Sequence, residues 1–176
     1  MNTSIVIAGF GGQGILFLGK LMAYAGLIKG KEVSWLPSYG PEMRGGTANC
    51  NVNISDTAIG SPIVTKPDIL IAMNLPSLEK YEGEVPEGGT VFYDSSLASL
   101  KSEKAGVKAF GIPATKLAAE NGLEGLANMI IFGKVLKESG IFTLEETEKA
   151  LAKVVPARKA DLAEKNLQAI KMGFNA

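Results

Sequence analysis

Residues 4–15 read SIVIAGFGGQGI, a short apolar run that passes into four glycines and then into a second apolar stretch. The β-branched run at residues 4–8 is typical of a buried strand, and residues 15–28 are rich in Ala and Leu over a length that suits a helix. A strand, a glycine turn and a helix in this order open a βαβ unit. The sequence therefore predicts an α/β fold, and the rest of the chain can be placed around this unit.

Further apolar runs continue the pattern on the carboxyl side of this unit. Residues 47–55 (TANCNVNIS) alternate between apolar and Asn side chains, which is typical of a strand with one buried face. The sequence thus predicts one Rossmann-like domain over residues 1–176, with a mostly parallel sheet, helices on both faces and a helical C-terminal third. It does not predict the strand order. Strands are expected at residues 32–36, 47–55, 68–73, 90–93 and 107–110, and helices at 75–81, 113–120, 124–139, 144–154 and 158–172.

The composition excludes several classes of function. The chain has 176 residues, 18 basic and 18 acidic side chains, one Cys and no His. A zero net charge disfavours nucleic acid as a partner. One Cys without His supplies neither the four ligands of an iron–sulfur cluster nor a zinc site nor a His-dependent catalytic triad. We therefore assign no catalytic residue and no metal site to this chain.

The N-terminus carries no targeting signal that the sequence reveals. Residues 1–4 lack a basic region, and the apolar run at residues 5–8 is too short for a signal peptide or a membrane span. We expect a cytoplasmic protein without a membrane partner.

The glycine turn matches the pattern G-x-G-x-x-G between a strand and a helix. Such a turn lets backbone N–H groups approach a phosphate at the helix N-terminus, although the glycines also suit a tight turn with no ligand. A nicotinamide enzyme also needs an acid at the end of the second strand, where this sequence has Leu36 and Pro37. Glu32 stands at the other end of that strand, which disfavours NAD.

The loop at residues 38–46 (SYGPEMRGG) is the most distinctive stretch of the chain. Pro41 and the glycines restrict its shape, and Arg44 offers a planar fork of donors that suits a phosphate or a carboxylate. Because the loop follows the second strand, we expect it near the glycine turn. The alternative is that Glu42 and Arg44 form an ordinary surface ion pair.

Together these motifs resemble the gamma subunit of 2-oxoacid:ferredoxin oxidoreductases. The resemblance rests on GFGGQG at residues 9–14, on YGPEMRGG about 25 residues later and on TANCNVNIS, and it continues through IGSP at 59–62 and PDILIA at 67–72. It extends to LANM at residues 126–129 and to Asn166 and Gly173, and so covers almost the whole chain. The pairing of the two glycine-containing motifs is far more specific than either one alone.

The resemblance implies an enzyme complex that oxidatively decarboxylates a 2-oxoacid, forms an acyl-CoA and reduces ferredoxin. It places thiamine diphosphate, Mg²⁺ and the iron–sulfur clusters in partner subunits of alpha, beta and ferredoxin-like delta type, and implies that this chain is inactive alone. This chain would contribute to the coenzyme A side of a composite site, or its loops would be an interface for the thiamine-binding subunits. The residues implied for the coenzyme A side are Gly11, Gly12, Gln13, Gly14, Tyr39, Glu42 and Arg44.

Three other residues invite a structural or a functional interpretation. Asn128 lies in an apolar helix and needs hydrogen-bond partners, so it has a structural role or contacts the ligand. Cys50 lies on the apolar face of its strand and is expected to be a small core residue. Trp35 is expected in the core, with a partner interface as the alternative.

Two other functions stay open at this point. One is a stand-alone dinucleotide-dependent oxidoreductase, and the other is a non-catalytic scaffold on a Rossmann-like fold. Within the family, pyruvate, 2-oxoglutarate and branched-chain 2-oxoacids are all candidate substrates, with a preference for the last two. Subunit stoichiometry does not follow from the sequence.

Overall fold

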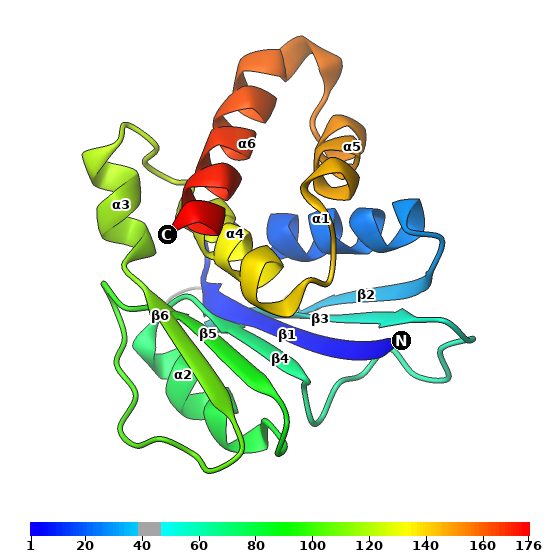
Figure 1. Ribbon diagram of the computed structural model, residues 1–176, viewed down its shortest axis with the longest axis vertical. Helices are drawn as coiled ribbons and strands as arrows, with labels where there is room; N and C mark the ends of the chain where they lie inside the picture. The colour runs from blue at the N-terminus through cyan, green and yellow to red at the C-terminus, as the bar shows by residue number, and fades with distance from the viewer. Residues whose placement is uncertain (39–46) are drawn as a thin grey trace.

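The strand β1 (Asn2–Phe10) lies inside a six-stranded sheet with the order β2-β3-β1-β4-β5-β6. The computed structural model describes residues 1–38 and 47–176. Within these residues β3 runs antiparallel to both of its neighbours, and the β1–β4, β4–β5 and β5–β6 pairs are parallel. The α/β fold is confirmed, with a mixed sheet (Figure 1). The other strands are β2 (Glu32–Ser38), β3 (Thr47–Ser55), β4 (Ile69–Ala72), β5 (Thr90–Asp94) and β6 (Lys108–Ile112).

Helices cover both faces of the sheet, as the sequence predicts (Figure 1). On one face α1 and α4 pack on the strands, with α5 against α1 and α6 against α4. The other face holds α2, which packs on β1 and β4. The helices are α1 (Ile15–Ile28), α2 (Leu75–Tyr81), α3 (Ala114–Glu120), α4 (Ala127–Ser139), α5 (Leu144–Val154) and α6 (Ala160–Asn175), with short 3₁₀ turns η2 (Glu82–Glu84) and η3 (Ala157–Lys159).

The alternating pattern of β3 divides the two faces as expected. Cys50, Val52 and Ile54 are fully buried under α1, while Asn51 and Asn53 on the opposite side are half-buried. The strands β1 and β4 are buried on both sides, so Ile5 and Ile7 join the large core beneath α1 and α4. Val6 and Leu70 form a smaller core beneath α2.

The helices α4 and α6 cross at unusually close range. A Cβ added to Gly173 would lie 1.7 Å from the carbonyl oxygen of Ile130, and one added to Gly133 would lie 2.0 Å from that of Ile170. Only glycine fits at these two positions, so the pair of helices is locked by backbone contact. This crossing fixes the C-terminal part of the chain over the sheet.

Two sequence-based expectations about the edge strand β2 need correction. Pro37 does not end β2, because β2 is an edge strand and the missing N–H of a proline costs no ladder bond on the open side. Trp35 is 37% exposed and not a core residue, since it lies on that edge strand and packs only partly over Gly19 and Cys50. Cys50 itself is a core residue, as expected.

Candidate functional site

The glycine turn lies at the carboxyl edge of the sheet, between β1 and α1. β1 ends at Phe10, and its parallel neighbour β4 ends at Ala72. α1 leaves β1 over one face of the sheet, while α2 leaves β4 over the other face (Figure 1). The segments that follow β1 and β4 therefore diverge here. Open α/β sheets bind ligands in the crevice at such a switch point.

The side chain of Gln13 holds the turn against the end of β4. Its Oε1 accepts from the backbone N–H of Phe10 (2.7 Å) and from Nδ2 of Asn74 (3.2 Å), and its Nε2 donates to the carbonyl of Met73 (3.0 Å). The backbone N–H of Gln13 also donates to the Phe10 carbonyl at 3.2 Å. Because its amide is committed to the protein, Gln13 shapes the turn from the inside.

Gly14 and Asn128 join the turn to α4. Gly14 is the N-cap of α1, with φ 72° and ψ 28° and without a side-chain cap. Its carbonyl accepts from Leu18 N (3.0 Å) and from Nδ2 of Asn128 (3.1 Å). Asn128 is buried, and a Cβ on Gly14 would lie 2.3 Å from its Nδ2. Asn128 thus has the hydrogen-bond partner that its burial requires, and it supports the turn from behind.

Gly12 faces outward, whereas Gln13 and Gly14 face the protein. It has φ +91°, and among the described residues nothing lies within 4 Å of the position where its Cβ would be. It lines a hollow of about 310 Å³ with Phe10, Gly11 and Phe17. On its other side it lines a hollow of about 260 Å³ with Gln13, Met73 and Leu97. The open backbone of the turn therefore stands between two concave surfaces.

Three of the predicted site residues, Tyr39, Glu42 and Arg44, lie outside the described residues. The strands on both sides of that segment are described: Ser38 is paired with Asn49, and Thr47 is paired with Phe10 at the end of β1. Thr47 therefore lies beside the start of the glycine turn, whereas Ser38 lies one strand further out, across β3.

Sequence reasoning missed two polar residues at this edge. Asn74 lies two residues after the end of β4 and caps α2, with its Oδ1 accepting from Ser77 N at 2.9 Å. Asp94 ends β5 and is fully buried; its carboxylate accepts from the backbone N–H and the hydroxyl of Thr115 and from Ser96 N. The available signal was an Asn or Asp directly after an apolar run and before a helix or turn. Both residues brace the edge around the turn.

The thiol of Cys50 offers no chemistry to this site. The side chain is fully buried between β3 and α1, with Sγ 3.6 Å from the carbonyl of Ile15. Burial raises the pKa of the Cys50 thiol to about 12, although its hydrogen bond with Trp35 acts in the opposite direction. The group is therefore a protonated core thiol at neutral pH.

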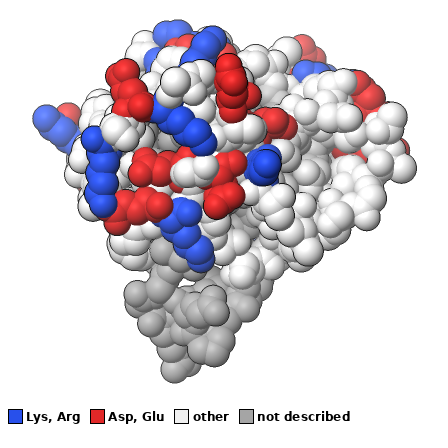
Figure 2. Space-filling view, turned by 90° about the horizontal axis from the view of Figure 1, so that it is seen from below, with Lys and Arg blue, Asp and Glu red and all other residues white. Residues whose placement is uncertain are grey.

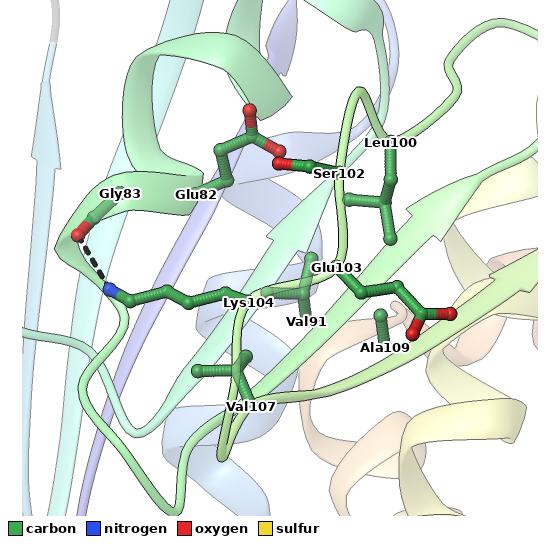
Figure 3. A pocket seen from close by; sticks show the side chains of 9 residues that line it. All are labelled: Glu82, Gly83, Val91, Leu100, Ser102, Glu103, Lys104, Val107 and Ala109. Atoms are coloured by element: carbon green, nitrogen blue, oxygen red, sulfur yellow. Dashed lines mark hydrogen bonds between the residues drawn. The ribbon is translucent and has the colours of Figure 1, made fainter.

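A larger hollow than the two beside Gly12 lies elsewhere, at the amino ends of β5 and β6. It has a volume of about 500 Å³ and is bounded by η2 and the β5–β6 connection (Figure 3). Val91 and Val107 line it, but its one base, Lys104, is committed: Nζ donates to the carbonyls of Gly83 (2.9 Å) and Val85 (2.7 Å). Lys104 thus fastens the connection to η2, and the cavity lacks the backbone donors of the glycine turn.

The charge on the α2 face is unevenly distributed. Figure 2 shows side chains of both signs gathered on one part of this face and a broad neighbouring part that carries none. Glu79 of α2 forms an ion pair with Lys101, with 2.7 Å between Nζ and Oε1. No three His, Cys, Asp or Glu side chains of the described residues are grouped to hold a metal ion. No described helix is both long and apolar enough to cross a membrane.

These features define a class: a Rossmann-like α/β domain whose glycine turn presents open backbone at the switch point of its sheet. The chain belongs to the pyruvate ferredoxin/flavodoxin oxidoreductase family, whose model matches residues 4–176. The resemblance inferred from GFGGQG and YGPEMRGG is thereby confirmed.

Relatives of known name agree with this assignment. The chain is 38% identical over 177 residues to the 2-oxoglutarate synthase subunit KorC of Methanocaldococcus jannaschii, covering 99% of this chain and 93% of that one. It is 41% identical over 170 residues to the ketoisovalerate oxidoreductase subunit VorA of Methanothermobacter thermautotrophicus, covering 96% of this chain and 35% of VorA. The chain therefore spans about a third of the length of VorA.

Solved structures share the fold. The gamma subunit of a keto/oxoacid ferredoxin oxidoreductase from Geobacter sulfurreducens matches with a TM-score of 0.83 and 30% identity, over 98% of this chain and 96% of that one. A chain of the 2-oxoglutarate:ferredoxin oxidoreductase from Magnetococcus marinus matches with a TM-score of 0.85 and 24% identity, over 99% of this chain and 30% of that one. The fold thus occurs both as a whole chain and as part of a longer one.

Proposed function

We propose that this chain is the gamma-type subunit of a cytoplasmic, multisubunit 2-oxoacid:ferredoxin oxidoreductase. The complex would oxidatively decarboxylate a 2-oxoacid, form an acyl-CoA and pass electrons to ferredoxin. The observation that carries this proposal is the family match over residues 4–176, together with a KorC relative of nearly the same length. The chain would not catalyse the reaction alone.

The composition supports a division of labour between subunits. With one buried Cys and no His, the chain does not provide the four ligands that an iron–sulfur cluster requires. We therefore assign the clusters to partner subunits of alpha, beta and ferredoxin-like delta type, and on the family resemblance we assign thiamine diphosphate and Mg²⁺ to them as well. The cofactors then supply the redox chemistry, and this chain binds and positions.

Coenzyme A is the ligand that we assign to the glycine turn. The N-terminus of α1 has no side-chain cap, and Gly12 leaves its backbone open, which suits a phosphate approaching the N–H groups. Arg44 would add a charge-assisted contact, with Tyr39 and Glu42 shaping the cleft. The Magnetococcus marinus enzyme, which shares the fold, carries 2-oxoglutarate, coenzyme A and succinyl-CoA in its solved structure.

The strand order speaks against a stand-alone NAD enzyme. In the dinucleotide-binding fold the second strand lies directly beside the first, and an acid at its end holds the ribose. Here β3 separates β2 from β1, and Glu32 stands at the start of β2, paired with Ser55. An acid from β2 would lie two strand spacings, about 10 Å, from β1. We expect no NAD or NADP binding in the micromolar range by calorimetry.

The relatives leave the choice of 2-oxoacid substrate open. KorC is named for 2-oxoglutarate and VorA for ketoisovalerate, and this chain resembles both. Because the glycine turn would meet the coenzyme, the partner subunits are expected to select the 2-oxoacid.

Kinetics of the assembled complex test the coenzyme A assignment. Arg44→Ala is expected to raise the KM for coenzyme A more than the KM for the 2-oxoacid. Losing a charge-assisted contact costs about 1.5–3 kcal/mol, which corresponds to an increase of about ten- to hundredfold. Arg44→Lys should restore only part of the affinity, because a point charge lacks the planar fork. The matched control is Arg158→Ala, which removes the one other arginine of the chain.

Two outcomes would contradict the proposal at different levels. If Arg44→Ala dissociates the complex while the assembled remainder keeps a normal KM for coenzyme A, Arg44 is an interface residue and the phosphate assignment is wrong. If the pure, colourless chain turns over a 2-oxoacid with thiamine diphosphate and coenzyme A, the subunit assignment is wrong.

A further inference from the structure

Hydrogen bonds fix the two segments that bound the cavity at the amino ends of β5 and β6. These segments are η2 and the connection from β5 to β6 (Figure 3). Lys104 bonds the connection to the carbonyls of Gly83 and Val85. The N–H of Gly88 also donates to the carbonyl of Gly106 at 2.7 Å. The space between the segments, about 500 Å³, is thus held by bonds within the protein and has the size of a small-molecule site.

One side of the cavity is apolar. Val91 is buried in the smaller core beneath α2, and Leu100 and Val107 pack against that core and are half-buried. Ala109 lines the cavity as well, with a side chain that leaves room. An apolar cavity of about 150 Å³ binds a benzene ring, so a cavity of about 500 Å³ has room for a body of about two rings.

Two carboxylates line the cavity besides these apolar side chains. Glu82 comes from η2 and Glu103 from the connection, and Figure 3 shows their carboxylates apart from each other. Neither carboxylate forms an ion pair among the described residues, since Lys101 is paired with Glu79 and Lys104 is bonded to carbonyls. The acids of residues 79–87 and 100–107 outnumber the bases by five to three: Glu79, Glu82, Glu84, Glu87 and Glu103 against Lys80, Lys101 and Lys104.

This lining selects a ligand that is both apolar and positively charged. Small-molecule sites are mostly apolar, with a few polar groups that orient the ligand. The excess of acids repels an anion, and a neutral apolar molecule gains nothing from the carboxylates. An ammonium group beside an exposed carboxylate gains about two- to fivefold in affinity, the range of exposed ion pairs.

We propose that this cavity binds an organic amine with an apolar body of about two rings. The body packs on Val91, Leu100 and Val107, and the ammonium group lies near the carboxylates of Glu82 and Glu103. The cavity lies at the amino ends of the strands, whereas the glycine turn lies at the carboxyl end of β1. The amine site therefore goes beyond the proposed function and does not depend on the coenzyme A assignment.

Heteronuclear NMR titration of the full chain tests the proposal with three probes that share one naphthalene body. Naphthylethylamine is a cation, naphthylethanol is neutral and naphthylacetate is an anion. The amide signals of residues 100–107 report binding at the cavity, and those of residues 10–14 report binding at the glycine turn. Glu103→Gln removes one charge from the cavity, and Ala109→Trp fills its space from an exposed position. The matched control is Glu84→Gln, since Glu84 is exposed on η2 and does not line the cavity.

We expect the amine to shift the signals of residues 100–107 with an affinity about tenfold above that of the alcohol, because two carboxylates contribute about two- to fivefold each. The acid should bind more weakly than the alcohol. Glu103→Gln should weaken binding of the amine about two- to fivefold and leave that of the alcohol unchanged, whereas Glu84→Gln should leave both unchanged.

Ala109→Trp should abolish binding of both probes. Equal affinities for the amine and the alcohol, an absence of shifts at residues 100–107, or the same loss in Glu84→Gln as in Glu103→Gln would each overturn the proposal. If Ala109→Trp does not fold, the comparison of Glu103→Gln with Glu84→Gln decides the question.

Discussion

The side chain of Gln13 holds the glycine turn against the end of β4, and Gln13→Ala tests this directly. The substitution removes the hydrogen bonds to Phe10 N, Met73 O and Asn74 Nδ2. A hydrogen bond contributes about 0.5–1.5 kcal/mol, and a buried polar group left without a partner costs about 1–3 kcal/mol. Met73 and Asn74 are buried, while Phe10 is partly exposed and its N–H can turn to water. We therefore expect a loss of about 2–4 kcal/mol in the free energy of unfolding.

Thermal and denaturant unfolding of the isolated chain measure this loss. In a domain of this size each kcal/mol lowers Tm by about 2–4 °C, so Gln13→Ala should melt about 4–16 °C below the wild type. The matched control is Gln168→Ala, since Gln168 is the one other glutamine and is exposed on α6. An exposed substitution of this kind changes stability by about 0.5 kcal/mol or less. If both variants melt within about 1 °C of each other, the turn is not held by Gln13.

Three further predictions test the core and the surface. Gly173→Ala should lower the free energy of unfolding by about 1–3 kcal/mol through overpacking against α4, whereas Gly83→Ala, with open space around it, should change it little; an unchanged Gly173→Ala chain would contradict the backbone contact. Cys50, with its pKa raised to about 12 by burial, should resist thiol reagents at pH 8 until the chain unfolds; rapid labelling of the folded chain would contradict this. The side chain of Lys31, and to a smaller extent the Met1 ammonium group, lowers the pKa of Asp56 to about 2. The wild type should therefore be more stable than Asp56→Asn at pH 7, and this difference should fade as pH falls from about 4 to about 2. A difference in stability that persists at pH 2 would contradict this prediction.

Local signals were sufficient to place most helices and strands. α1, α2 and α5 have the predicted bounds, because glycine turns, an N-cap or a capping box mark their ends. The capping box is present in the structure, with Thr143 and Glu146 bonded to each other's backbone. The predicted start of α4 was three residues early, because Gly125 adopts φ +84° and the helix begins only at Ala127.

The order of the strands could not be predicted from the sequence, for a physical reason. The direction of β3 depends on pairing with β1 along its whole length, from Asn2 with Ser55 to Phe10 with Thr47. These partners are far apart in the sequence, so no local pattern encodes the choice. The exposure of Trp35 has the same origin, since it follows from β2 being the edge strand.

The candidate site was predictable in type but not in the roles of its residues. GFGGQG predicts a turn that exposes its backbone, but this motif alone gives Gly12, Gln13 and Gly14 the same predicted role in ligand binding. The structure separates them: Gln13 is bonded inward, Gly14 is bonded to Asn128 and Gly12 alone points into open space. Such roles depend on Met73 and Asn128, which are distant in the sequence.

This separation of roles gives the coenzyme A assignment a second test, at Gly12. Gly12 borders both hollows, whereas Phe10 and Leu97 each border one of them and are exposed beyond the turn. A Cβ at Gly12 meets no described atom, so Gly12→Ala adds strain of about 1–3 kcal/mol from its positive φ and obstructs a phosphate that approaches the turn. Leu97→Ala leaves the backbone donors of the turn in place. The affinity for coenzyme A should therefore fall in Gly12→Ala and stay close to that of the wild type in Leu97→Ala, because the ligand meets the backbone of the turn.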